Sequence, residues 1–201
     1  MAYRLLILSS FMLLTACGTA PPSNVNDLCD IFEEKDDWYD DAADASEKWN
    51  VPIVDIMAIM HQESRFVHDA QPPRRKILWI IPGPRLSSAY GYPQAKTETW
   101  ETYQRATGEY GADRDDFEDA ADFVGWYTNT SYKRCGINRG DTYASYLAYH
   151  EGHGGYNRRT YNKKAWLKKV ARKVEKRANT YRNQLSSCEK DLNRKGWFDW
   201  F

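Results

Sequence analysis

Residues 51–66 read VPIVDIMAIMHQESRF, and this stretch indicates the kind of fold that the chain adopts. Pro52 suits the first turn of a helix, and the apolar residues that follow predict a helix that is mostly buried. Glu63 stands near the C-terminal end of that helix. A glutamate at a helix end is most often a solvent-facing side chain. An apolar wall and the negative helix end would instead raise the pKa of its carboxyl group and make it a proton donor near neutral pH.

The sequence on both sides of this stretch is also helical in pattern, and we find no internal repeat. The exception is KILWIIPGP, residues 76–84, a β-prone run between prolines that we expect to form an extended arm or a hairpin strand. The fold class is therefore a single, mainly α domain with one arm. A stripe of Trp38, Ala42, Ala45 and Trp49 predicts an amphipathic helix before this stretch. After the arm, we expect a helix over residues 96–107 that ends at Gly108, and a helix capped by Asp113 or Asp115. Two more helices are expected, one capped by Asp141 and ended by Gly152, and one over residues 162–188.

The N-terminus has the features of a targeting signal rather than of part of the folded domain. Arg4 precedes an apolar run, residues 5–14, that is too short to span a bilayer. LTAC, ending at Cys17, has the form of a bacterial lipobox, which predicts cleavage before Cys17 and a lipid on its thiol. The alternative is an ordinary signal peptide cut near Ala16 or Ala20. We expect a signal peptide at 1–16, a lipidated cysteine and tether at 17–25, and the domain at 26–201.

Three further cysteines remain for an oxidising compartment, which is an odd number. Cys29 and Cys188 both continue core-facing helical stripes near opposite ends of the chain, so we predict that they form a disulfide. Cys135 lies in a polar stretch, SYKRCGINRG, and is the candidate free thiol.

The formal net charge is zero, with 28 basic and 28 acidic residues, which argues against a dedicated nucleic-acid binder. The charges are distributed unevenly, because residues 27–48 are rich in acid and residues 158–182 are rich in base. Two solvated helix faces would explain this pattern. Contact of the basic face with an anionic membrane or polymer is the alternative.

The stretch AYHEGHGGY, residues 148–156, concentrates histidines and glycines. It does not match a zinc-protease helix, because His150 and His153 are three residues apart with Gly152 between them, and no third ligand is evident. A phosphate-binding loop is also excluded, because no strand precedes the glycines and no Lys-Ser/Thr follows them. We therefore predict no metal. The glycines favour close approach of the backbone to a ligand.

Three motifs, in order, resemble those of the lytic transglycosylases of the soluble-lytic-transglycosylase (SLT) domain class, within the goose-type-lysozyme-like superfamily. HQESRF resembles their Gln-Glu-Ser-x-aromatic motif, SSAYGYPQA their Gly-Leu-Met-Gln motif, and AYHEGHGGY their Ala-Tyr-Asn-x-Gly-x-Gly motif. The resemblance covers about residues 52–156. Three departures are that Tyr92-Pro93 replaces Leu-Met, His150 replaces Asn, and the arm separates the first two motifs more widely than usual.

The resemblance implies a lysozyme-like fold and a peptidoglycan cleft with no cofactor. Glu63 would be the catalytic acid and base, and Tyr149 would hydrogen-bond and orient it. Glu151 would lie on the surface at a helix end, with a role as a second acid as the alternative. The implied substrate-binding residues are Ser64, Gly91, Tyr92, Gln94, His150, Gly152 and Gly154.

The expected activity is cleavage of the bond between N-acetylmuramic acid and N-acetylglucosamine with formation of a 1,6-anhydro end. The expected partners are peptidoglycan glycan strands and, through a lipid on Cys17, a membrane; protein partners are not indicated. Gly18 after Cys17, in place of Asp, favours the outer membrane, with the enzyme facing the periplasm. A goose-type-like muramidase that uses water and a non-catalytic peptidoglycan-binding lipoprotein are the alternatives.

Overall fold

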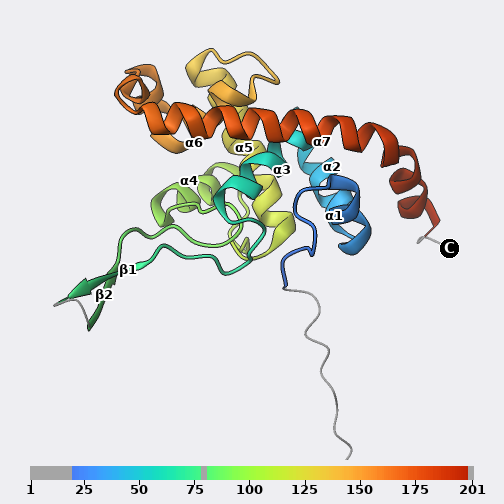
Figure 1. Ribbon diagram of the computed structural model, residues 1–201, viewed down its shortest axis with the longest axis horizontal. Helices are drawn as coiled ribbons and strands as arrows, with labels where there is room; N and C mark the ends of the chain where they lie inside the picture. Colours follow the sequence, from blue (N-terminus) through green and yellow to red (C-terminus); the bar gives the residue numbers. More distant parts are fainter. Residues whose placement is uncertain (1–19, 78–80, 199–201) are drawn as a thin grey trace, which may run out of the picture.

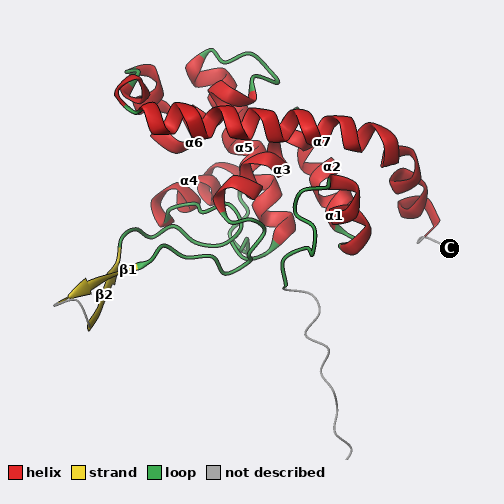
Figure 2. Cartoon of the chain, viewed as in Figure 1, coloured by secondary structure: helices red, strands yellow, loops and turns green. Residues whose placement is uncertain are grey.

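The computed structural model describes residues 20–77 and 81–198, and helices make up most of this part of the chain (Figure 2). The expectation of a mainly α domain with an extended arm is confirmed. The elements are α1 (Leu28–Glu34), α2 (Trp38–Trp49), α3 (Ile53–Glu63), β1 (Arg74–Ile77), β2 (Ile81–Arg85), α4 (Thr97–Thr107), α5 (Phe117–Cys135), α6 (Thr142–Asn157), the 3₁₀ helix η1 (Thr160–Lys163) and α7 (Ala165–Phe198).

Helix α3 lies at the centre of the fold and packs against α2, α5 and α7. Every residue from 54 to 60 is buried, which explains why this helix is apolar on all sides. The one polar residue of this run is Asp55, which is also fully buried; its carboxyl group accepts a hydrogen bond of 2.7 Å from the Thr142 hydroxyl. Burial raises the pKa of its carboxyl group, and Arg182 lies 4.0 Å away. This central position holds the last residue of α3, Glu63, on the packed helices rather than on a loop.

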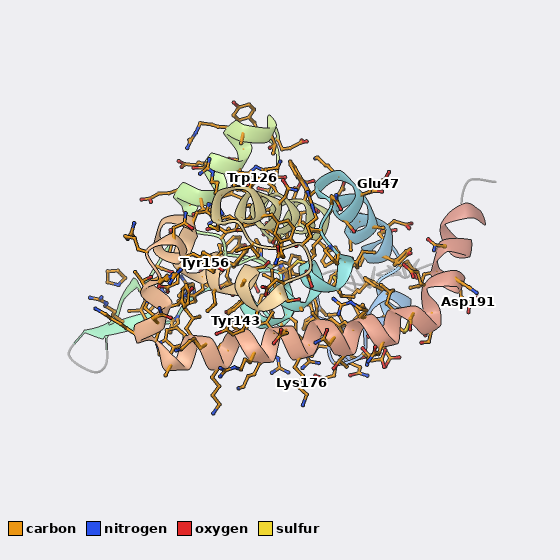
Figure 3. All side chains as sticks on the ribbon, turned by 90° about the horizontal axis from the view of Figure 1, so that it is seen from above. Glu47, Trp126, Tyr143, Tyr156, Lys176 and Asp191 are labelled. Atoms are coloured by element: carbon orange, nitrogen blue, oxygen red, sulfur yellow. A yellow bond between two sulfur atoms is a disulfide. The ribbon has the colours of Figure 1, made fainter. Side chains whose placement is uncertain are left out.

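Helix α7 crosses the whole domain and packs against α1, α3 and α6 (Figure 1). The predicted stripe is its inner face, where Leu167, Val174 and Tyr181 are almost completely buried. The predicted basic face is its outer side, on which Lys176 points away from the other helices (Figure 3). The helix begins at Ala165, later than predicted, because η1 occupies residues 160–163.

The N-terminal part of the domain is bound to α7 by a covalent bond and by hydrogen bonds. Cys29 and Cys188 form a disulfide with a Cα–Cα distance of 6.1 Å, and Cys135 is free, as predicted. Nearby, the Tyr181 hydroxyl donates to the Val25 carbonyl at 2.6 Å, and the Gln184 side chain accepts from the Leu28 amide at 3.1 Å. The two ends of the domain are therefore joined along one helix.

Aspartate side chains cap three of the helices, and the sequence predicted an aspartate cap for two of these, one of them at the wrong position. Asp27 caps α1, and Asp141 caps α6 by accepting from the Ala144 amide at 2.9 Å. The cap of α5 is Asp116, not Asp113 or Asp115, and its side chain accepts from the Asp119 amide. In a run so rich in Asp, each carboxylate has equal intrinsic capping ability, and the start of the buried stripe at Phe117 decides between them.

The arm is an antiparallel hairpin that projects from the helices (Figure 1). Strand β1 pairs with β2 so that Arg74 lies opposite Arg85. Residues 78–80 of the arm, the expected signal peptide at 1–16 and Cys17, the expected site of the lipid, lie outside the described residues. Within the described ranges, no helix is long and apolar enough to cross a membrane.

Candidate active site

Glu63 is the last residue of α3, and its carboxyl group lines a cleft of about 460 Å³. The chain turns sharply after it, because Arg65 and Phe66 both adopt left-handed φ angles of 55° and 62°. Ser64 supports this turn, since its hydroxyl donates to the Met60 carbonyl and accepts from the Phe66 amide at 3.1 Å. Ser64 is buried and does not line the cleft, so the structure corrects its predicted role in substrate binding.

The environment of Glu63 is that of a proton donor. Burial raises the pKa of its carboxyl group to about 7, and a hydrogen bond from the Tyr146 hydroxyl opposes this effect only in part. A carboxyl group with this pKa is largely protonated below neutral pH and ionises readily above it. The prediction of a raised pKa is confirmed, with burial against the packed helices as its main cause.

Tyr146, rather than Tyr149, hydrogen-bonds Glu63. The Tyr149 hydroxyl donates instead to the Pro93 carbonyl at 2.7 Å, so the predicted contact of Tyr149 is wrong. Both tyrosines lie on α6 three residues apart and therefore on one face of the helix. Tyr149 still lines the cleft, where its ring packs edge-on against Tyr127 at 5.1 Å.

The loop between the arm and α4 forms the facing wall of the cleft. Gln94 lines the cleft, as predicted, but its amide nitrogen donates to the carbonyls of Ala70 and Gly91 at 2.7 and 2.9 Å. Its nitrogen therefore holds the wall together, and its amide oxygen is the polar atom left for a ligand.

Two predicted binding residues of this loop serve the fold instead. Gly91 has a φ of 75° and donates to the Ala70 carbonyl, and a Cβ here would overlap the backbone carbonyl of Arg114. Tyr92 is 4% exposed and packs edge-on against Trp38 and Phe117 in the core. Neither residue lines the cleft, because Gly91 lies against the backbone of Ala70 and Arg114 and Tyr92 packs against α2 and α5.

The AYHEGHGGY stretch forms a kink in α6. Gly152 has φ 72° and ψ 156°, which interrupts the helix as predicted, but a further helical turn continues to Asn157. Such a conformation is open to glycine and strained for other residues. His150 and Gly152 line the cleft, as expected for ligand contacts. Gly154 is exposed beside Arg158 and is not among the residues that line the cleft, so its contact with a ligand stays a prediction.

Glu151 has an environment opposite to that of Glu63, although both line the cleft. Its side chain is only 3% exposed, so the predicted surface position is wrong. Burial alone would raise the pKa of Glu151, but hydrogen bonds from Lys164, Thr160 and His150 lower it to about 2. The Lys164 ammonium group lies 2.7 Å from its carboxylate. Glu151 is thus ionised near neutral pH, and its carboxylate oxygens already have hydrogen-bond partners.

The two histidines of this stretch contact different groups. His150 Nδ1 lies 3.1 Å from the Glu151 carboxylate, whereas His153 Nε2 lies 3.0 Å from the Ser131 hydroxyl and its ring stacks on Tyr127. In the described ranges, no three His, Cys, Asp or Glu side chains form a group suited to a metal ion.

The sequence did not point to several residues of the cleft. Tyr127, which lines the cleft, and Tyr146, which hydrogen-bonds Glu63, were both missed, although the spacing of Tyr146 from Tyr149 by three residues was a usable signal. The others come from the base of the arm and from the start of α4, and only the folded chain brings them to Glu63. These additional lining residues are Pro72, Ser87, Ala89, Ala95, Lys96 and Thr99.

Comparison with known proteins agrees with this geometry. The sequence matches the family described as "Transglycosylase SLT domain" over residues 5–188, which is most of the chain. Neither the comparison with curated proteins nor that with solved structures finds a match. The family match, the helical fold and the glutamate in a cleft agree with the three sequence motifs, and lytic transglycosylase activity on peptidoglycan is the activity that this family indicates. The chain belongs to the transglycosylase SLT domain family.

Proposed function

We propose that the protein cleaves the β-1,4 bond between N-acetylmuramic acid and N-acetylglucosamine and leaves a 1,6-anhydro-muramyl end. The observation that carries this proposal is the pair of cleft carboxyl groups with opposite properties. Glu63 has a pKa of about 7 and a side-chain hydrogen bond from Tyr146, whereas Glu151 is ionised and hydrogen-bonded to three side chains. One cleft therefore offers one group that can both give and take a proton.

In the proposed reaction, the protonated Glu63 donates its proton to the glycosidic oxygen as the bond from that oxygen to C1 of the muramyl sugar breaks. The resulting carboxylate is stabilised by the Tyr146 hydroxyl and takes the proton of the muramyl 6-hydroxyl. The 6-oxygen then bonds to C1. Glu63 ends protonated, ready for another cycle, and no water is consumed.

The muramidase alternative differs in its nucleophile. A hydrolase activates water, commonly with a second carboxylate. Glu151 is the other carboxylate among the described lining residues, and its oxygens are bound by Lys164, Thr160 and His150. This arrangement favours a reaction that needs no second base. Digestion of purified sacculi followed by mass spectrometry tests the choice: anhydro ends, lighter by one water, support the proposal, and reducing ends overturn it.

The non-catalytic alternative is a lipoprotein that only binds the wall. It does not explain why a carboxyl group with a pKa near neutrality faces a cleft, because burial of such a group destabilises its ionised form without any gain for binding. Release of muropeptides by the purified protein decides this question, and intact sacculi after prolonged incubation would favour the binding role.

We further propose that residues 1–16 are a signal peptide and that Cys17 carries a lipid, which holds the enzyme in the periplasm at the outer membrane. The support is the LTAC sequence and Gly18 after the cysteine. A tether of residues 17–25 allows limited reach from the membrane to the wall. Cys17→Ser is expected to give a soluble enzyme that still digests isolated sacculi. Retention of this variant in membranes at high salt would show that the anchor lies elsewhere.

A further inference from the structure

An exposed aromatic side chain lies directly beyond the rim of the cleft. Trp166, at the start of α7, is 56% exposed. Its ring lies 5.2 Å from the ring of His150, in an edge-on arrangement with an interplanar angle of 78°. Because His150 lines the cleft, the two rings extend the cleft wall outward along the surface.

A single hydrogen-bonded network holds the His150 ring and the segment just before Trp166. The Glu151 carboxylate accepts from the Lys164 ammonium group, two residues before Trp166, and lies 3.1 Å from His150 Nδ1. An ionised carboxylate only accepts hydrogen bonds, so His150 Nδ1 must carry a proton, and Nε2 at the other end of the ring is left for a ligand. Thr160, in η1, also donates to Glu151 and joins the connecting segment to the network. The end of α6 and the start of α7 are therefore held together (Figure 1).

These two rings have the chemistry of a saccharide site. A β-1,4-linked N-acetylhexosamine carries its hydroxyl groups around the edge of the ring and presents axial C–H groups on both faces. Such a face packs flat on an indole, while an imidazole at the side can hydrogen-bond the equatorial hydroxyl groups. A glycan strand that is longer than the cleft must continue over its rim, where Trp166 is the exposed ring.

We propose that Trp166 and His150 form a further saccharide-binding subsite, which holds an N-acetylhexosamine unit of the glycan strand beyond the units bound beside Glu63. This inference rests on the proposed function, because it takes the strand in the cleft to be peptidoglycan. The subsite gives the enzyme a preference for long strands over short fragments. If the site bound a peptide stem instead, affinity would depend on the presence of the stem rather than on strand length, and the test below separates these two cases.

The test uses Glu63→Gln protein, which holds strands without cutting them, and measures binding by calorimetry. The probes are a peptidoglycan tetrasaccharide and octasaccharide, each with and without peptide stems. We expect Trp166→Ala to weaken binding of the stem-free octasaccharide about five- to tenfold, and the tetrasaccharide much less. Trp166→Phe should restore most of the affinity. Tyr110→Ala removes another exposed ring, 71% exposed and not lining the cleft, and should change neither affinity.

Equal affinities of Trp166→Ala and the parent protein for the octasaccharide would overturn the subsite. So would an equal loss for both lengths together with a lower Tm, which would make Trp166 a structural residue. A loss seen only with stem-bearing fragments would assign the ring to peptide binding and reject the saccharide. If wild-type protein leaves sacculi intact and the Glu63→Gln protein binds neither fragment, the proposed function itself fails. If the protein cleaves sacculi and binds the fragments but neither property changes on replacement of Trp166, only the subsite is rejected and the proposed function stands.

Discussion

The hydroxyl group of Tyr146, on α6, hydrogen-bonds the carboxyl group of Glu63, the last residue of α3. Burial raises the pKa of Glu63 and this bond lowers it, with a net value of about 7. The bond is strongest when Glu63 is ionised, because charged acceptors bind donors more tightly than neutral ones. Tyr146 therefore sets how readily Glu63 gives up its proton.

Replacing Tyr146 should move the pH dependence of the reaction. Glu63 acts as an acid while it is protonated, so we expect turnover to fall as the pH rises through about 7. In Tyr146→Phe the ionised form loses its donor, the pKa of Glu63 rises further, and the alkaline limb should move up by about one pH unit. A pH–rate profile checks this, with Tyr143→Phe on the same helix as the control. An unchanged limb would contradict the role of Tyr146.

Replacing Tyr149 should have a different effect. Its hydroxyl group supports the Pro93 carbonyl, next to Gln94 in the facing wall. Loss of this neutral hydrogen bond is worth about 0.5–1.5 kcal/mol, so Tyr149→Phe should raise KM by about two- to tenfold and leave the alkaline limb in place. A shifted limb with an unchanged KM would show that Tyr149 acts on Glu63 after all.

The folding stability should depend on Glu63 and on pH. The pKa of Glu63 is about 7 in the folded protein and near its ordinary value of 4.5 when unfolded, so the stabilising effect is complete below pH 4.5 and is lost as the pH rises through 7. Glu63→Gln removes this dependence. We expect the two proteins to be about equally stable at pH 4.5, and the variant to be more stable by up to about 3 kcal/mol at pH 8.

Urea unfolding at both pH values measures this difference. The pKa of Asp41 is also raised to about 7, by burial and by nearby carboxylates, so the wild-type curve alone contains both contributions. Asp41 is present in both proteins, so its contribution cancels in the difference between their free energies of unfolding. A gap between the two proteins that stays constant from pH 4.5 to pH 8 would show that Glu63 is not perturbed.

The disulfide should contribute strongly to stability, because it joins residues 159 positions apart. In the chain-entropy model its loss costs up to about 5 kcal/mol, or about 10–20 °C in Tm for a chain of this size. Cys29→Ser should show this loss in a thermal melt. Cys135→Ser, which alters the half-buried free thiol, should change Tm by much less. Equal shifts in the two variants would contradict the assigned pairing.

Local patterns in the sequence predicted most of the helices, the hairpin arm and the disulfide. Periodicity identifies a buried face wherever it is long, as in the Leu167, Val174 and Tyr181 stripe of α7. The helix limits were less certain, because the competing caps Asp113, Asp115 and Asp116 are chemically alike. The central apolar helix followed from composition, whereas the role of Glu63 depended on the resemblance of the three motifs to those of the SLT family.

The finer structure of the site depends on contacts between distant segments. Sequence motifs favoured Tyr149 as the partner of Glu63, but Tyr146, on the same helix face, makes that hydrogen bond, and Tyr149 bonds the Pro93 carbonyl. Glu151 was expected at the surface, and its burial depends on Lys164 and Thr160 in the segment that follows. Gly91 belonged to a recognisable motif, yet only the fold shows that it serves backbone packing rather than the ligand.

The most direct test of the central claim compares wild-type protein with Glu63→Gln on purified sacculi and quantifies released muropeptides by mass spectrometry. We expect the release of anhydro-muramyl products to fall by about 10²–10⁴-fold in the variant, which stays folded with a Tm no lower than that of the wild type and still binds sacculi. Glu101→Gln, which alters an exposed carboxyl group on α4, should leave the release unchanged. Release by Glu63→Gln at the wild-type rate would contradict the account.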